Sequence, residues 1–181
     1  LWQLANVRYI VGARGTEGEL NRLFDPVRKS FKPVLGFDLA PKPGSPPGGR
    51  MGLDDITAIV NPTGQYAVIE YGGALPRAGL YPRWEVIPDN AAALKRLEDA
   101  SFDPAVSVVL DAPPVRPGGG TMAASTNAPA VGSTESLITE WDPKRVVIRT
   151  ACSQDAVLLL NDRWDPDWHV TVDGTPATLV R

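Results

Sequence analysis

The sequence predicts a mainly β protein, an antiparallel β-sandwich of jelly-roll type with one or two short helices; an α+β fold is the alternative. Two observations carry this prediction. The 181 residues include 17 glycines and 18 prolines, and each proline fixes φ and removes a backbone donor, so long helices are not expected. Short apolar or alternating runs also recur at roughly 8–12-residue spacing between turn signals, which is typical of antiparallel sandwiches.

The composition excludes several other classes of protein. Hydrophobic residues make up 43% and charged residues 22% of the chain, as in ordinary globular domains. A formal net charge of -3 offers no basic surface, so nucleic acid is not an expected partner. The single cysteine, Cys152, and the single histidine, His169, provide neither an internal disulfide nor a Cys/His metal cluster, and no cofactor is expected.

Local patterns predict the first elements in chain order. A strand over 7–11 ends at Gly12, and a helix over 16–24 begins with Thr16 three residues before Glu19, the spacing of a capping box. A broken strand at 31–39 and a Pro/Gly-rich loop at 41–49 follow. Two further strands, at 56–60 and 65–71, are separated by an Asn-Pro-Thr-Gly turn at 61–64.

The middle of the chain contains the clearest helix. It runs over 91–98 behind the cap Pro88-Asp89-Asn90 and consists of good helix formers. Short strands at 84–87 and 106–110 flank it. The segment 112–134 is rich in small residues and carries little charge, so it is interpreted as a long flexible loop.

The last part of the chain contains a series of strands. Their expected ranges are 136–140, 145–150, 156–161, 168–172 and 177–180. Asp173-Gly174 is a two-residue hairpin signal between the last two. All of these segments are strands that need pairing partners, which is why 112–134 is interpreted as a loop and not as a domain boundary.

This reading gives one domain, 1–181, with an N-terminal α+β lobe at about 1–111, the loop 112–134 and an antiparallel β part at 135–181. The chain begins at Leu1 inside a motif and stops inside an expected strand, so we expect an excised piece with a truncated end. No run approaches the ~20 apolar residues of a membrane span. The piece itself is therefore expected to be soluble.

Two tryptophans near the end suggest a contact with carbohydrate. Trp164 and Trp168 bracket Asp165-Pro166-Asp167. Exposed indoles stack on sugar faces, and carboxylates accept hydrogen bonds from sugar hydroxyls. The alternative is structural: Trp168 fills the sandwich core and Trp164 covers its edge. Both interpretations stay open at this stage.

Charged residues around this segment also have two interpretations each. Asp162, Asp165 and Asp173 lie among turn residues, where aspartates cap backbone donors; the alternatives are ligand binding and paired carboxylates of a glycoside hydrolase. Arg77 is expected to pair with an aspartate of this C-terminal segment, and a substrate clamp is the alternative. No catalytic residue is assigned, and the roles of His169 and Cys152 are left open.

Four segments, in this order, carry a resemblance to a known family. They are 6–11 (NVRYIV), 75–78 (LPRA), 102–104 (FDP) before 106–110 (VSVVL), and 158–168 (LLLNDRWDPDW) running into 172–174 (VDG). Together they resemble the C-terminal extracytoplasmic region of YfhO-like bacterial membrane proteins. That family is related to the C-type glycosyltransferases, which use lipid-linked sugar donors.

The resemblance implies a non-catalytic domain on the extracytoplasmic face of the bacterial membrane, belonging to a polytopic protein related to these transferases. Such a domain would position a glycan acceptor or donor. Its implied partners are the transmembrane part of its own chain and a cell-envelope glycan or lipid-linked sugar. A self-contained carbohydrate-binding sandwich is the main alternative, and a carboxylate-dependent glycoside hydrolase is the least favoured.

Overall fold

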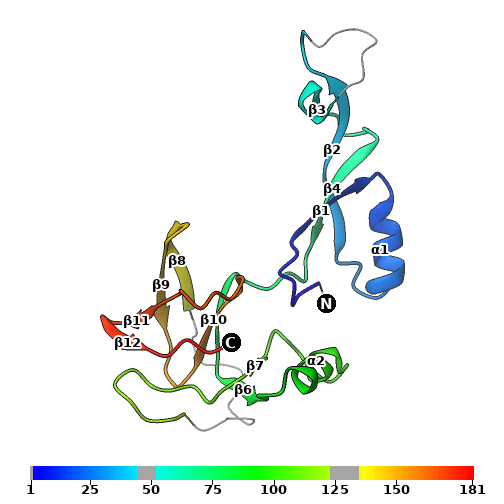
Figure 1. The fold of residues 1–181 in the computed structure, drawn as a ribbon. Coiled ribbons are helices and arrows are strands. Elements are labelled where there is room, and N and C mark those ends of the chain that lie inside the picture. Colours follow the sequence, from blue (N-terminus) through cyan, green and yellow to red (C-terminus); the bar gives the residue numbers. More distant parts are fainter. Residues whose placement is uncertain (1, 45–51, 123–134) are drawn as a thin grey trace. The chain divides into compact units, whose positions relative to one another are not determined.

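The chain divides into two compact units, Trp2–Ala74 and Leu75–Arg181, each of which is described by itself. The computed structural model describes residues 2–44, 52–122 and 135–181 (Figure 1). The sequence predicts an N-terminal lobe that extends to about 111. The division lies earlier because β5, the first strand after Leu75, pairs with β10 in the C-terminal part of the chain.

The first unit is a four-stranded antiparallel sheet in the order β1-β4-β2-β3. Its elements are β1 (Tyr9–Ala13), α1 (Thr16–Phe24), β2 (Phe31–Pro41), the 3-10 turn η1 (Leu53–Asp55), β3 (Ile56–Val60) and β4 (Tyr66–Tyr71). The strand predicted as broken at 31–39 is continuous, with a register shift between Pro33 and Leu35. Of the loop predicted at 41–49, residues 45–49 lie outside the described residues.

One face of this sheet forms a small core against α1. Phe31, Ala67 and Ile69 are buried there, and Leu20 of α1 and Trp2 pack against them. The Asn21 side chain fixes the helix to β2, since its amide donates to the Phe31 carbonyl (2.8 Å) and its oxygen accepts from the Phe31 N–H (3.0 Å). The two elements are thereby joined through backbone groups that would otherwise be unpaired.

The start of α1 corrects the predicted capping box. The residue before the helix is Gly15 in the left-handed region (φ 93°), and no side chain caps the helix there. Instead the Glu17 carboxylate accepts from the Gly15 N–H at 3.0 Å. A glycine takes this backbone conformation without steric cost, so Thr16 becomes the first helical residue instead of the cap.

At the turn predicted at 61–64, the chain crosses β2 on its way from β3 to β4. Both β3 and β4 pair with β2, on opposite sides of it, and Phe37 is opposite Val60 in one pair and Tyr66 in the other. The connecting residues cross β2 at Gly36, whose carbonyl accepts from the Asn61 N–H at 2.9 Å. A Cβ built on Gly36 would lie 2.5 Å from the Asn61 carbonyl oxygen.

Asp38 holds this crossing in place. Its carboxylate accepts from the Gln65 N–H (2.7 Å) and from the Asn61 side-chain amide (2.6 Å). These two hydrogen bonds, the backbone one first, lower the pKa of Asp38 below its ordinary value. The charged form is therefore the one that stabilises the crossing.

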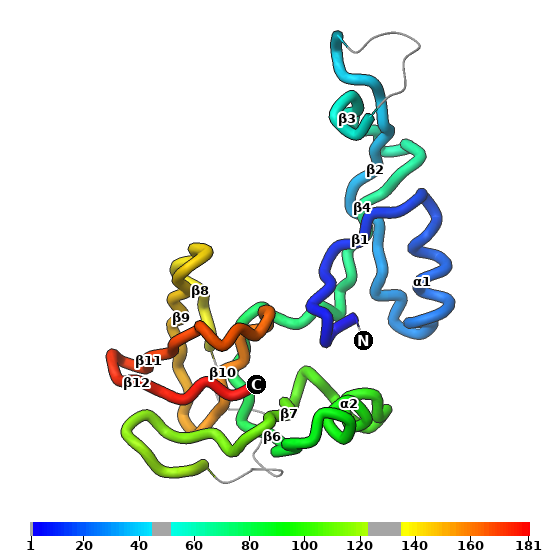
Figure 2. The backbone as a smooth tube through the Cα atoms, viewed as in Figure 1, coloured from blue at the N-terminus to red at the C-terminus, as the bar shows by residue number. Residues whose placement is uncertain are grey.

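The second unit contains the remaining strands in smaller sheets, whose chain path can be followed in Figure 2. Its elements are β5 (Ala78–Tyr81), β6 (Arg83–Val86), α2 (Asn90–Glu98), β7 (Ser107–Leu110), β8 (Glu135–Asp142), β9 (Arg145–Ala151), β10 (Val157–Leu160), β11 (Val170–Val172) and β12 (Thr175–Ala177). The pairs β5–β10, β8–β9 and β11–β12 are antiparallel.

The β6-α2-β7 segment is the exception, because β6 and β7 are parallel. Parallel neighbours need a crossover, and α2 supplies it. The predicted cap of this helix is confirmed: the Asp89 carboxylate accepts from the Ala92 N–H at 2.8 Å. Arg96 of α2 then binds Glu85 of β6 through two hydrogen bonds of 2.8 Å each.

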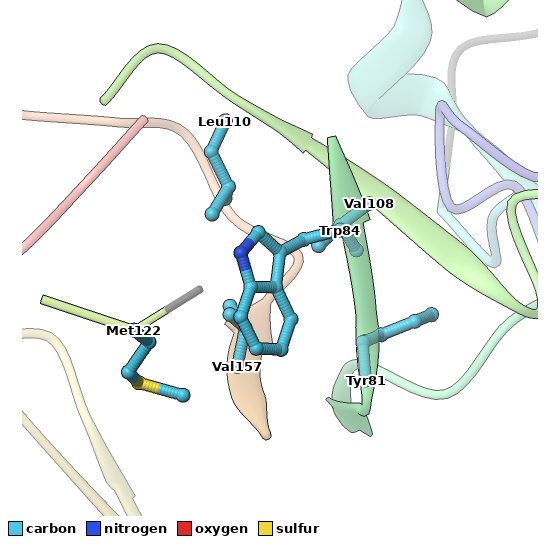
Figure 3. Close-up of a cluster of buried hydrophobic side chains, with 6 residues drawn as sticks. All are labelled: Tyr81, Trp84, Val108, Leu110, Met122 and Val157. Carbon is cyan, nitrogen blue, oxygen red and sulfur yellow. The ribbon is translucent and has the colours of Figure 1, made fainter. Parts of the chain in front are cut away.

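The core of the second unit forms around Trp84, which is 2% exposed (Figure 3). It is a cluster of six residues from five places in the chain: Tyr81, Trp84, Val108, Leu110, Met122 and Val157. Met122 corrects the loop prediction in part, since this residue is buried and Val115 and Thr121 form a β-bridge before it. The rest of that loop, 123–134, lies outside the described residues.

The hairpin predicted at Asp173-Gly174 is confirmed. Val172 lies opposite Thr175, and both turn residues have positive φ, 52° and 80°, as a type I′ turn requires. The mainly β fold class with two short helices is likewise confirmed, and its sheets are antiparallel apart from β6–β7.

The crossing over β2 predicts the effect of one glycine substitution. Gly36→Ala is expected to lower the free energy of unfolding by about 1–3 kcal/mol, because the new methyl group overlaps backbone oxygens that cannot rotate away. The matched control is Gly18→Ala inside α1, where nothing lies within 4 Å of the added Cβ. That change is expected to stabilise by about 0.5–1 kcal/mol. Urea unfolding followed by circular dichroism measures both, and equal stability of the two variants would contradict the crossing.

Candidate ligand-binding pocket

The second unit contains a pocket of about 350 Å³ in which two of the predicted residues, Trp164 and Trp168, meet. Its apolar walls come from β7, β9, β10, β11 and the last residues of the chain. The polar residues of its lining are Asp162, Arg163, His169 and Arg181. A concave apolar surface with a few polar groups is the usual form of a small-molecule site.

The strand β10 and the turn after it position these residues. β10 pairs with β5 from Val157↔Tyr81 to Leu160↔Ala78, and the Asn161 N–H then donates to the Arg77 carbonyl at 2.8 Å. Beyond this last bond the chain leaves the sheet. The residues that follow are therefore free to form the rim of the pocket.

Asp165 and Pro166 shape the turn between the two tryptophans. The Asp165 carboxylate accepts from the Asp167 N–H (2.9 Å), and its carbonyl accepts from the Trp168 N–H (3.2 Å). An aspartate that accepts from the backbone two residues ahead, followed by proline, is a common start of a tight turn. Asp165 thus has the turn role that the sequence analysis favoured, and it does not line the pocket.

The tryptophans are on the pocket and not in the core. Trp164 is 47% exposed and Trp168 is half-buried. The alternative interpretation placed Trp168 in the core, but the tryptophan of the buried cluster is Trp84. Trp164 is thus exposed and Trp168 half-buried at one concave surface, and neither belongs to the buried cluster around Trp84.

Arg77 pairs with Asp162, as expected from the sequence. Its guanidinium donates to the Asp162 carboxylate at 2.9 Å and lies 4.3 Å above the ring of Trp141 in β8. The Arg163 N–H also donates to Asp162 (2.8 Å), and this bond, with that from Arg77, lowers the pKa of the carboxyl group. Asp162 is therefore held in its charged form at the rim.

Asp173 lies apart from these residues, at the turn of the β11–β12 hairpin, and does not line the pocket. His169, whose Nδ1 lies 2.8 Å from the Asp167 carbonyl oxygen, does line it. The structure thus brings together Asp162, Trp164 and Trp168, with Arg77 acting through Asp162. Among the residues it describes, no group of three His, Cys, Asp or Glu side chains has the geometry to hold a metal ion.

Sequence reasoning missed most of the lining. Val146 and Ile148 of β9 form part of the wall, and Arg163 lies between two predicted residues. Trp141, which lies under the Arg77 guanidinium, is in β8, one residue beyond the strand expected at 136–140. The apolar run Val146–Ile148 could identify β9 as a partly buried strand, but no local signal shows which other strands meet it.

A second pocket, of about 360 Å³, lies beside β6 and α2 and has a structural role. Its charged groups are largely engaged: the Glu85–Arg96 pair lines it, and the Arg96 guanidinium also stacks over Phe102 at 5.1 Å. The hydrogen bonds from Arg96 lower the pKa of Glu85. This network fixes α2 to β6, and it leaves the first pocket as the better ligand site.

Comparisons with known proteins give no relative for this chain. No family model matches it, no curated protein matches it, and no solved structure matches it. In the parts of the chain that the structure describes, neither helix has the length and apolar character needed to cross a membrane. The resemblance to YfhO-like proteins stays a prediction, and the pocket stands on its own geometry.

The Arg77–Asp162 pair predicts a pH-dependent stability. Because the folded-state pKa of Asp162 lies below its ordinary value of about 3.9, its stabilising contribution is complete above that value and is lost as the pH falls through the folded-state pKa. Asp162→Asn is expected to lower the free energy of unfolding at pH 7 by less than about 1 kcal/mol, since the pair is well exposed to solvent.

Urea unfolding at pH 7 and at about pH 3 measures this effect. The difference between wild type and Asp162→Asn should shrink at the acidic pH, and it should be smaller in an Arg77→Gln background at pH 7. A difference that is the same at both pH values and in both backgrounds would show that Asp162 contributes nothing through this pair.

Proposed function

We propose that the Leu75–Arg181 unit is a non-catalytic glycan-contact module. The observation that supports this function is the arrangement of Trp164, Trp168 and the charged Asp162 around one concave pocket. Indole faces stack on the apolar C–H faces of sugars, and an ionised carboxylate accepts hydrogen bonds from sugar hydroxyls. The three predicted residues that meet here are those that such a contact needs.

The state of Asp162 supports a binding role over a hydrolytic one. A glycoside hydrolase needs two carboxyl groups at the scissile bond, and the proton donor has a raised pKa. The pKa of Asp162 is lowered by its bonds to Arg163 and Arg77. Among the described residues, Asp162 is also the one Asp or Glu that lines this pocket.

The wider proposal concerns the protein to which the module belongs. In it, the chain is part of the extracytoplasmic region of a polytopic bacterial membrane protein related to glycosyltransferases with lipid-linked donors. The ordered motifs of the sequence support it. The module would hold an acceptor glycan or a sugar donor near the membrane-embedded part of the same protein.

Tryptophan substitutions test the glycan contact. Trp164→Ala and Trp168→Ala are each expected to weaken binding to a glycan selected on an array by about tenfold or more, since a buried aromatic contact contributes about 1.5–3 kcal/mol. Tyr9→Ala is the matched control, because Tyr9 is a similarly exposed aromatic of the other unit. Thermal unfolding checks that the variants fold. Binding that survives both tryptophan substitutions, or a wild-type chain that binds no glycan, would exclude this function.

Cys152 tests the proposed location. It is the one cysteine of the 181 residues and is exposed. In spheroplasts of cells that make the full-length protein, a membrane-impermeant maleimide is expected to label it without lysis. Cys152→Ser is the control and should remove that label. Labelling that requires lysis would place the unit on the cytoplasmic side.

A further inference from the structure

The walls of the pocket are more apolar than a sugar contact requires. Val146 and Ile148 of β9, Leu158 and Leu160 of β10, and Val170 of β11 line it behind the tryptophans. None of these side chains can pair with a hydroxyl, and an unpaired polar group in such surroundings is costly. The interior is therefore suited to hydrocarbon, whereas the rim offers the polar contacts.

The volume of the pocket sets the length of such a hydrocarbon. An apolar cavity of about 150 Å³ is large enough for benzene. The pocket here has about 350 Å³, so by simple proportion it has room for roughly twice as many carbon atoms, about a dozen. This corresponds to a single aliphatic chain of medium length.

The charges at the rim favour a negative end group. The Asp162 carboxylate is paired with Arg77, and the Arg181 guanidinium donates to Asn90 (2.8 Å) and lies 3.7 Å from Asp111. By contrast, no residue that the structure describes forms a hydrogen bond or ion pair with the Arg163 guanidinium. Arg163 is thus the uncompensated charge of the lining, and it is positive.

We propose that this pocket binds the aliphatic chain of a single-chain amphiphile, with an anionic group of the ligand against Arg163. The inference deepens the proposed function and rests on it for the ligand's polar end, where a sugar would contact Trp164 and Trp168. The chain occupies the space between β9 and β10, and the head group stays at the rim. The walls, the volume and the free guanidinium each support the same ligand class.

Two probe series test the chain. The 181-residue protein is titrated with n-alkanoates and with n-alkyl β-maltosides of 8, 10 and 12 carbons, below their micelle concentrations, by calorimetry. Each buried methylene is expected to raise the affinity by up to about fourfold. The affinity should rise with length in both series and level off beyond about a dozen carbons, as the pocket fills.

Paired variants separate the pocket from unspecific detergent binding. Ile148→Trp fills the interior and is expected to reduce chain binding at least tenfold, whereas Leu137→Trp, on the exposed part of β8, should not. Arg163→Gln is expected to weaken alkanoates several-fold and leave the uncharged maltosides unchanged. Its control is Arg149→Gln on β9, which does not line the pocket. Because Arg163 is at the surface, Arg163→Gln and its control Arg149→Gln still test the inference if Ile148→Trp does not fold.

The outcomes distinguish this inference from the proposed function. The inference is overturned if the affinities do not depend on chain length, or if Ile148→Trp leaves both series unchanged and Arg163→Gln leaves the alkanoate affinity unchanged. If the protein binds a glycan on the array but its affinity for the alkyl probes does not depend on chain length, the inference is overturned and the proposed glycan contact is kept. Chain-dependent binding without any glycan binding supports the pocket as a hydrocarbon site and overturns the glycan contact.

Discussion

The Arg77 side chain joins segments of the second unit that lie far apart in the sequence. Its guanidinium stacks on Trp141 and donates to Asp162, 85 residues away. The backbone carbonyl of Arg77 accepts from the Asn161 N–H, just after β10. A carboxylate beside apolar walls is unfavourable unless it is paired. Arg77 supplies that pairing, so the turn that carries Trp164 and Trp168 can lie against the pocket with a charged residue at its start.

The pocket and the core of this unit share part of their surface. Leu110 and Val157 belong to the buried cluster around Trp84 and also line the pocket. The floor is therefore held by the same packing that stabilises the unit, and substitutions there would change stability and binding together. The wall residues Val146 and Ile148 are outside that cluster, which makes them the better positions at which to alter the site alone.

Local sequence signals predicted most elements, because the interactions that define them are short in sequence. The helix behind Asp89 and the Asp173-Gly174 turn depend on neighbours a few residues away, and each is where it was expected. The Arg77 pairing was also expected, since a partly buried guanidinium needs a carboxylate. The two tryptophans were singled out by their spacing and residue type.

The remaining features depend on partners that no local pattern specifies. The parallel pairing of β6 and β7 needs a crossover whose path is set by packing, and the strand at β5 has only four residues. The crossing at 61–64 looks like an ordinary turn until β2 is placed between its two strands. In the same way, the pocket walls come from strands separated in the sequence, so their shared surface is visible only in three dimensions.

The spread of these partners along the chain has a consequence for synthesis on the ribosome. Every strand partner of the Trp2–Ala74 sheet lies within the first 71 residues, so that sheet can form as soon as they emerge. The cluster around Trp84 needs Val157, and β5 needs β10. Trp84 therefore stays partly exposed to water until Val157 and the rest of β10 have been translated. This half of the nascent chain is the one that holdase chaperones would bind.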